Sequence, residues 1–304
     1  MSPNHPRFAK KWAIALSLAG LVCTTAAGSI SPIVLTIEAS NASGEATFEV
    51  MYGDGEWDPN ALEFTWNWTS SPIELRDPDN NALIARVLDA FVQVRNDNEL
   101  SVNLSVEAGS SQTSFWATSP LVSFIAVPDE YATCRAVASV SIQDTGGGPG
   151  SYALAVGIGP TGIGIFRAYY NGLGYEGERF TDLVGFVFAG SGGSASGYQA
   201  DPAVGYRAVG SDVYSLSTLT AFTLTATDRL TTTTLMGFSA PDFCPGDLTA
   251  DGAVDIDDLG TLLESFGAEL GDSLYVEDAD FDRNGSVDLG DLSTLLTLFG
   301  SSCS

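Results

Sequence analysis

Most of the chain alternates apolar and polar residues with a period of two, the pattern of strands that bury one face. In the segment 99–108, for example, Leu100, Val102, Leu104 and Val106 all fall on the same side. Similar runs rich in Val, Thr, Ile, Phe and Tyr are separated by clusters of Gly, Ser, Asn, Asp and Pro. This pattern predicts strands at 31–40, 45–52, 62–68, 83–95, 99–108, 120–127, 134–144, 152–158, 164–172, 182–190 and 216–238.

So many short strands predict a mainly β fold, in which residues 28–240 form a large all-β sandwich of jelly-roll-like type. Three glycine-rich stretches, 144–151, 157–164 and 190–197, interrupt it. A glycine-rich loop that binds phosphate leads into a helix, and none of these stretches precedes a helical pattern. We therefore interpret them as loops between strands.

After residue 240 the period of the apolar residues changes to that of a helix, and the new pattern occurs twice. The first apolar stripe consists of Leu259, Leu262, Leu263 and Phe266, and the second of Leu292, Leu295, Leu296 and Phe299. Gly267 and Gly300 follow the stripes and are typical helix ends. Such short stripes have little else to pack against, so we expect the two helices to bury each other in a small separate domain at 241–304.

Each predicted helix follows a 12-residue loop in which oxygen-bearing side chains alternate around a central glycine, as in EF-hand loops. Gly252 and Gly285 occupy position 6, where the backbone turns sharply, while Val254 and Val287 at position 8 are suited to pair with each other. The predicted ligands of the first loop are Asp247, Thr249, Asp251, the carbonyl of Ala253, Asp255 and Asp258. Those of the second loop are Asp280, Asp282, Asn284, the carbonyl of Ser286, Asp288 and Asp291.

Oxygen donors at this spacing predict that the chain binds two calcium ions. Thr249 is a neutral donor at position 3, where the second loop has Asp282, so we expect the second site to bind calcium more tightly. Without a cation the clustered carboxylates repel one another. Calcium binding should therefore be coupled to the folding of this domain.

The charge and the N-terminal segment predict the compartment. The chain has 12 basic and 38 acidic residues, a net charge of −26, which excludes nucleic acid and anionic membrane surfaces as partners. Residues 1–27 combine a basic start, a short apolar stretch and small residues before Ala27, which predicts a signal peptide cleaved near Ala27. A buried N-terminal helix is the alternative. We expect an exported protein, extracellular or at the cell surface, without membrane insertion.

Cysteine positions support an exported protein. Of the four cysteines, Cys23 belongs to the predicted signal peptide, and Cys134 is predicted to be a buried thiol within a strand. Cys244 precedes the first acidic loop by three residues, and Cys303 follows the second Phe-Gly pair by three. A disulfide between Cys244 and Cys303 would join the two ends of the duplicated unit.

Missing residue types exclude several reaction classes. The only histidine, His5, and both lysines, Lys10 and Lys11, lie in the predicted signal peptide. Histidine-based nucleophile systems, histidine-ligated zinc and Schiff-base chemistry are therefore excluded for the exported chain. Carboxylate pairs of the glycosidase kind remain, but no pair of acidic residues stands out, and we assign no catalytic residue. The tryptophans at 57, 66, 68 and 116 suit a sugar-binding face, although core packing is the commoner role of such residues.

The duplicated loops and helices, with Asp258 and Asp291 at position 12, resemble a type I dockerin. The flanking cysteines resemble the cysteine-bounded variant found on exported planctomycete proteins, and the resemblance is confined to the C-terminal segment. Dockerins dock cohesin modules, so the resemblance implies a cohesin-like or other surface docking protein as partner. Positions 10 and 11, Ile256-Asp257 and Leu289-Gly290, differ from the Ser-Thr pair common in cellulosomal dockerins, so the partner is not identified.

Three functions remain open at this point. The first is an exported, non-enzymatic binding or structural β-sandwich that a calcium-dependent dockerin-like module anchors to a surface or extracellular complex. The second is a polysaccharide-active enzyme, by elimination a carboxylate-based glycoside hydrolase, or a carbohydrate-binding module on the same anchor, with polysaccharide as a further partner. The third is a structural calcium clip that only stiffens the C-terminus.

Overall fold

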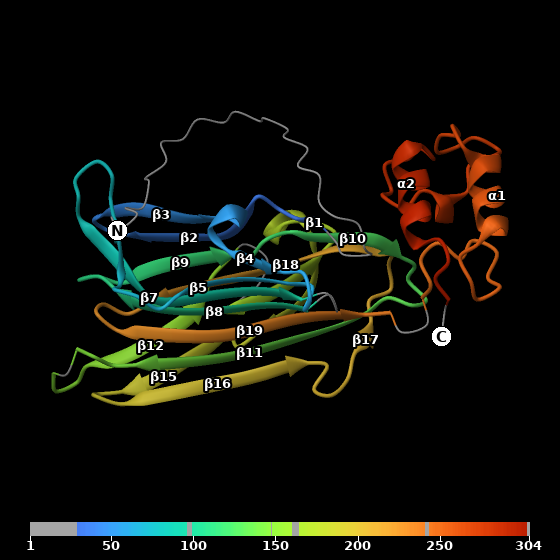
Figure 1. Cartoon of the computed structure of the whole chain (residues 1–304). Helices are drawn as coiled ribbons and strands as arrows, with labels where there is room; N and C mark the ends of the chain where they lie inside the picture. The colour runs from blue at the N-terminus through green and yellow to red at the C-terminus, as the bar shows by residue number, and fades with distance from the viewer. Residues whose placement is uncertain (1–28, 96–98, 147, 160–163, 241–242, 303–304) are drawn as a thin grey trace.

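The computed structural model describes residues 29–302, except for 96–98, 147, 160–163 and 241–242 (Figure 1). The predicted signal peptide, residues 1–27, lies outside the described residues. The described chain is mainly β, in antiparallel sheets, and two short helices follow near its C-terminal end. The prediction of a mainly β fold is therefore confirmed.

In the described part of the chain, the first sheet has ten strands. Its main path runs through β1 (Ser29–Ile30), β10 (Val122–Val127), β18 (Val213–Leu224), β9 (Thr113–Thr118), β2 (Ile33–Asn41) and β3 (Gly44–Met51). Strand β18 also pairs with β12 (Tyr152–Gly157) and β13 (Phe166–Tyr170), which in turn pair with β15 (Phe186–Gly190) and β14 (Glu178–Leu183). The long strand β18 therefore pairs with four other described strands and lies at the centre of this sheet.

The second sheet has nine strands among the residues that the structure describes. Its path runs through β16 (Ser194–Asp201), β11 (Thr133–Gln143), β19 (Arg229–Ser239), β8 (Glu99–Ala108), β7 (Leu83–Arg95), β5 (Glu63–Trp68) and β4 (Glu56–Asp58). The short strands β17 (Arg207–Ala208) and β6 (Ile73–Arg76) pair with β11 and β7. Three short 3₁₀ helices complete the described elements, at Tyr52–Asp54, Gly174–Glu176 and Glu277–Ala279.

The two sheets share one apolar core, as in a β-sandwich. Strand β8 buries every second residue, as its alternating sequence predicts, and Val102 and Leu104 are among the buried side chains. From the first sheet, Phe115 and Phe222 belong to the same core cluster, and their rings stack 5.2 Å apart. A fully buried side chain of this size stabilises the fold by about 2–3 kcal/mol.

Several segments differ from the predicted strands. The run 182–190 is divided between the end of β14 and the whole of β15, with a break at residues 184–185. The run 216–238 is two strands rather than one, because the chain turns at residues 225–228, where Thr227 has a φ of +65°. Apolar and threonine residues continue through this turn, so the pattern does not reveal it. Residues 194–197, predicted as a loop, begin the edge strand β16, which pairs along its length with β11. An edge strand buries few side chains, so small residues are tolerated there.

The tryptophans of strand β5 confirm the core interpretation. Trp66 is buried, and the half-buried Trp68 packs against the same core. Trp116, on β9, is also half-buried but joins a separate small cluster with Tyr169 and Leu219. Trp57 is the most exposed of the four tryptophans in the described chain. The candidate sugar-binding tryptophans therefore do not form one exposed face.

The C-terminal unit, residues 243–302, contains helices α1 (Ile256–Ser265) and α2 (Leu289–Leu298) and lies beside one end of the sandwich (Figure 1). Asp255 caps the first helix and Asp288 the second. In each case the carboxylate three residues later, from Asp258 or Asp291, accepts a hydrogen bond from the capping residue's N–H. These capping boxes explain why both helices begin at the end of their acidic loops.

The prediction that the two helices bury each other's stripes is wrong for half of the residues. Leu262 and Leu295 are fully buried, but Leu263 and Leu296, the next residues, are exposed. Phe266 and Phe299 are exposed as well. Each helix has only ten residues, and Val254, Val287, Ala279 and Phe281 from the surrounding loops fill the centre of the unit. The loops therefore leave room for only part of each helical stripe.

The two repeats are joined by reciprocal backbone contacts, which differ from the predicted pairing. Val254 and Val287 are both fully buried in the same cluster. The backbone of Val254, however, exchanges hydrogen bonds of 2.8 and 2.9 Å with residues 300–301, and Val287 does so at 2.8 and 3.0 Å with residues 267–268. Each loop is thus tied to the end of the other repeat's helix, which gives the unit a two-fold pseudosymmetry.

The cysteines agree with their predicted environments where the structure describes them. Cys134 is a free, buried thiol in β11, and burial raises its pKa to about 12. Cys244 is disulfide-bonded, whereas its predicted partner Cys303 lies outside the described residues. Within the described part of the chain, no helix is long and apolar enough to cross a membrane.

Candidate metal centre

Three predicted ligands of the second loop lie together. Carboxylate oxygens of Asp280, Asp282 and Asp291 all lie within 4.8 Å of one another. Asp280 and Asp291 are buried, so water screens their charges poorly. Burial raises the pKa of Asp291, and the charges of Asp282 and Asp280 raise it further. The clustered carboxylates therefore repel one another, and a bound cation would relieve this repulsion.

Both loops fold around the carboxylate at position 1. Asp280 accepts hydrogen bonds from the N–H groups of Asn284 (3.1 Å) and Gly285 (2.9 Å). In the first loop, Asp247 accepts the equivalent hydrogen bonds from the N–H groups of Asp251 (3.1 Å) and Gly252 (2.9 Å). Gly285 has a φ of +90° and Gly252 a φ of +92°, a conformation that other residues rarely adopt. The glycines at position 6 thus have the role that the spacing predicts.

The carboxylate at position 12 closes each loop. Asp291 accepts hydrogen bonds from the N–H groups of Phe281 (2.7 Å) and Asp288 (2.8 Å). Asp258 is held in the same way by the N–H groups of Leu248 (2.8 Å) and Asp255 (2.7 Å). The beginning and end of each loop are therefore joined through one aspartate, which lies at the start of the following helix.

The first loop has a different carboxylate cluster. Here the oxygens that approach within 4.8 Å belong to Asp251, Asp255 and Asp257, and Asp251 and Asp257 are exposed. Asp257 is not a predicted ligand. Its position within the acidic loop is the feature of the sequence that could have identified it. Asp258 accepts a further hydrogen bond from the Thr249 hydroxyl at 3.1 Å. Burial by itself raises the pKa of Asp258, but the hydrogen bonds from Asp255 and Thr249 bring it below its usual value.

The remaining predicted ligands line the same loops. Asn284 donates to the Asp282 carboxylate at 3.1 Å, and its own side-chain oxygen accepts from the Ser286 N–H at 2.9 Å. Asp288 is engaged as the cap of α2 and accepts from the Gly290 N–H at 2.6 Å. In the first loop, the Ala253 N–H donates to Asp251 at 3.0 Å. These side chains are ordered by the loop itself, while metal ligation by them stays a prediction.

The donor set of the second loop has the chemistry that a hard divalent cation such as calcium requires. All of the clustered groups offer carboxylate oxygens, the preferred ligands of Ca²⁺, and all three accept hydrogen bonds from backbone N–H groups. Tyr275, which sequence reasoning did not identify, donates its hydroxyl hydrogen to Asp280 at 2.7 Å. It thereby orients a candidate ligand from outside the loop. The first loop, with more exposed carboxylates, is the less complete site.

The body of the protein contacts the second loop directly. The N–H of Ala126, in β10, donates to the carbonyl of Phe281 at 3.4 Å. The Arg283 guanidinium forms ion pairs with Asp212, at the start of β18, at 3.2 Å and with Glu277 at 2.9 Å. A cavity of about 610 Å³ lies at this junction and is lined by residues of both loops and of the body. Nothing in the local sequence around either loop indicates these contacts.

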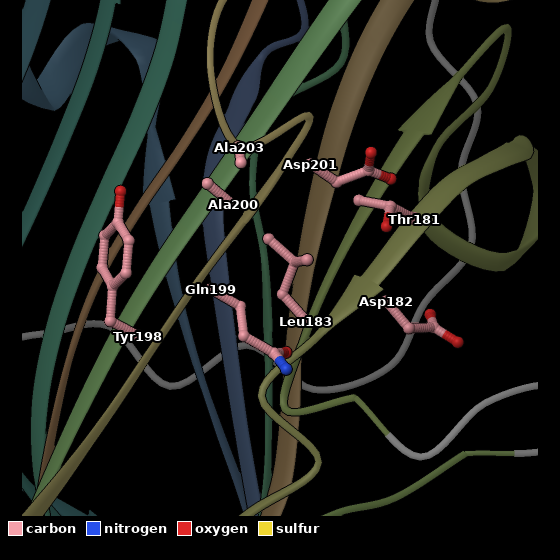
Figure 2. A pocket seen from close by; sticks show the side chains of 8 residues that line it. All are labelled: Thr181, Asp182, Leu183, Tyr198, Gln199, Ala200, Asp201 and Ala203. Carbon is pink, nitrogen blue, oxygen red and sulfur yellow. The ribbon is translucent and has the colours of Figure 1, made fainter.

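A shallow groove of about 460 Å³ lies on the body, where edge strands β14 and β16 approach each other (Figure 2). Asp201 lies beside Thr181 in this groove, and Tyr198 projects at its far side. Hydrogen bonds from Arg207 lower the pKa of Asp201, the opposite of what a general acid requires. The groove's other carboxylate, Asp182, forms an ion pair with Arg179 at 2.9 Å. This arrangement does not favour glycosidase chemistry in the groove.

No family model matches the chain, and no curated protein matches it with significant similarity. The residues of the two loops and their geometry are therefore what indicates a metal centre.

Proposed function

We propose that the C-terminal unit is a dockerin-like, calcium-dependent attachment module that anchors an exported protein to a surface or extracellular complex. In this proposal two calcium ions organise the loops, and the paired helices form the docking face for a cohesin-like or other surface protein. The body, a β-sandwich of jelly-roll-like type, is the non-catalytic binding or structural part that the module carries.

A duplicated set of exposed apolar residues carries this proposal. Ile256 and Leu289 are 66% and 72% exposed, Leu263 and Leu296 are 52% and 54% exposed, and Phe266 and Phe299 are 42% and 45% exposed. The two members of each pair occupy the same position in the two repeats. Exposed apolar groups concentrated on a small unit are typical of protein interaction surfaces.

The same residues favour docking over a structural clip. A clip needs only the buried cluster around Leu262 and Leu295, which is complete without the exposed side chains. Leaving six large apolar side chains in water has no benefit for a unit that merely stiffens the C-terminus. A partner that covers these side chains would remove their apolar surface from water, and this burial would stabilise the complex.

Calcium binding is tested on the full chain by isothermal titration after chelation and dialysis. We expect two binding events. Asp291→Asn should remove the second site, and Asp258→Asn should remove the first, because each variant alters the carboxylate that closes its loop. Failure of the full chain to bind calcium would overturn the proposed function.

Docking is tested by measuring the affinity of the full chain for a panel of purified cohesin modules, with calcium and with a chelator. Binding should require calcium and should be lost in the double variant Leu263→Ser and Leu296→Ser. Phe186→Ser is the matched control, because Phe186 is also exposed but lies on the body. Calcium binding without affinity for any cohesin in the panel would favour a different surface partner. Equal binding by the double variant would refute the docking face.

One observation favours polysaccharide binding by the body as a second candidate function. The rings of Tyr152 and Phe188 stack 5.9 Å apart on the adjacent strands β12 and β15, and both are exposed. Phe186 is exposed on the same face of β15, because alternate residues of a strand share a side. Flat aromatic surfaces of this kind suit the apolar faces of sugar rings. Affinity electrophoresis in polysaccharide gels tests this function, and loss of retardation in Phe188→Ala is the expected result.

A further inference from the structure

We propose that the body regulates the second calcium loop, so that calcium occupancy of this loop and attachment of the C-terminal unit to the body stabilise each other. The proposal rests on the calcium binding proposed above and adds a coupling between two parts of the chain.

The body contacts the second loop at positions 2 and 4. At position 2, Phe281 is buried, its carbonyl accepts from Ala126, and its N–H donates to the position-12 carboxylate of Asp291. A single residue therefore links the sandwich to a candidate ligand. Ile125, next to Ala126 in β10, packs against the apolar cluster of the C-terminal unit. Movement of the unit away from the body would disturb the loop that holds Asp291.

At position 4 the contact is electrostatic. Arg283 follows Asp282 and precedes Asn284, two predicted ligands, and is the only basic residue after Arg229. Its side chain is only 16% exposed, so water screens its charge poorly. Because Arg283 belongs to the loop itself, its positive charge opposes the binding of a divalent cation there unless carboxylates neutralise it. Glu277, from the unit itself, and Asp212, from the body, provide this neutralisation.

The body holds Asp212 in place for this contact. The same carboxylate accepts a hydrogen bond from the Asp129 N–H at 3.1 Å. The carbonyl of Asp212 accepts another from the Asn171 side chain at 2.7 Å. Asp212 is therefore a fixed charge of the sandwich, and it reaches Arg283 only when the C-terminal unit is attached in the described position.

The first loop provides an internal comparison. Its position 4 is Ala250, which has almost the same φ as Arg283, +58° against +55°, but carries no charge. The ion pair with the body is thus specific to the second loop. Because coupling between two equilibria is reciprocal, calcium in the second loop should stabilise the attachment of the unit, and hence the orientation of the docking face relative to the body.

The experiment measures calcium affinity in the full chain by isothermal titration, with the second site assigned through Asp291→Asn. Asp212→Asn should weaken calcium binding at the second site by about fivefold and leave the first site unchanged. Asparagine keeps an oxygen that accepts from Asp129, so the local fold of the body is retained. Asp79→Asn, which removes the same charge from an exposed turn between β6 and β7, should leave both sites unchanged.

A double-mutant cycle identifies Arg283 as the mediator. In an Arg283→Ala background, Asp212→Asn should no longer change the affinity of the second site, because no guanidinium remains to be neutralised. Equal calcium affinities in the wild type and Asp212→Asn, or the same fivefold loss in both backgrounds, would overturn the coupling. Absence of calcium binding by the wild type would instead overturn the proposed function itself.

Discussion

Two adjacent leucines in α2 provide a direct test of how the C-terminal unit is built. Leu295 is fully buried and Leu296 is 54% exposed, although they are the same residue type in the same helix. Leu295→Ala should destabilise the unit by about 3 kcal/mol, within the range for a buried leucine. Leu296→Ala should change its stability by less than about 0.5 kcal/mol, as for most surface substitutions.

The structure supports this magnitude for Leu295. Among the described residues, the apolar cluster of the unit has six buried members, so one leucine is a large part of it. The loops that would have to move to fill the cavity are held by the backbone hydrogen bonds of Val254 and Val287. Because these loops can collapse only partly, the loss should lie above the roughly 2 kcal/mol at the lower end of the range for a buried leucine. About 3 kcal/mol corresponds to a roughly 150-fold change in the local opening equilibrium.

Hydrogen exchange measured by mass spectrometry on the full chain, with calcium present, resolves this change. Amides of α1 and α2 should exchange about 150-fold faster in Leu295→Ala, because local opening controls their exchange. Peptides from β8 provide the control within the same protein, and they should be unaffected. In Leu296→Ala, the helical amides should stay within about twofold of the wild type. Equal acceleration by both variants would refute the assignment of Leu296 to an exposed docking face.

Three further predictions concern single residues. Burial, with a contribution from Asp144, raises the pKa of Asp228. The carboxyl group of Asp228 therefore stays protonated to a higher pH in the folded chain than in the unfolded chain. As a result, the stability of the fold decreases as the pH rises above the usual carboxyl range. In urea unfolding, Asp228→Asn should therefore leave stability unchanged near pH ~3 and increase it near pH ~7; the opposite pattern would contradict this reasoning. Tyr275→Phe removes the hydrogen bond to Asp280 and should weaken the second calcium site by about tenfold in calorimetry, while an unchanged affinity would show that Tyr275 does not orient the ligand. Gly285→Ala introduces a side chain at a φ of +90°, a strain of about 1–2 kcal/mol, and should weaken the same site; normal calcium affinity would show that the loop can relax.

Much of the body follows from local sequence patterns. The alternation in β7, β8 and β11 locates these strands almost to the residue, because a strand that buries one face needs an apolar side chain at every second position. Strands β4, β6, β9 and β16 are among those that the pattern did not predict, and β16 consists mostly of small and polar residues. Such a strand forms because a neighbouring strand satisfies its backbone hydrogen bonds, which is a property of the sheet and not of the segment.

In the candidate metal centre, the sequence alone determined the local features, which are formed by residues close together in the chain. The loops, the turns at Gly252 and Gly285, and the helix caps involve residues only a few positions apart, so their spacing predicts them. Only the tertiary structure decided which side chain of each apolar stripe is buried, since the loops compete with the opposite helix for the same space. It also decided that Arg283 contacts Asp212, far away in the chain. Such contacts depend on how separate elements pack, and no local pattern records that packing.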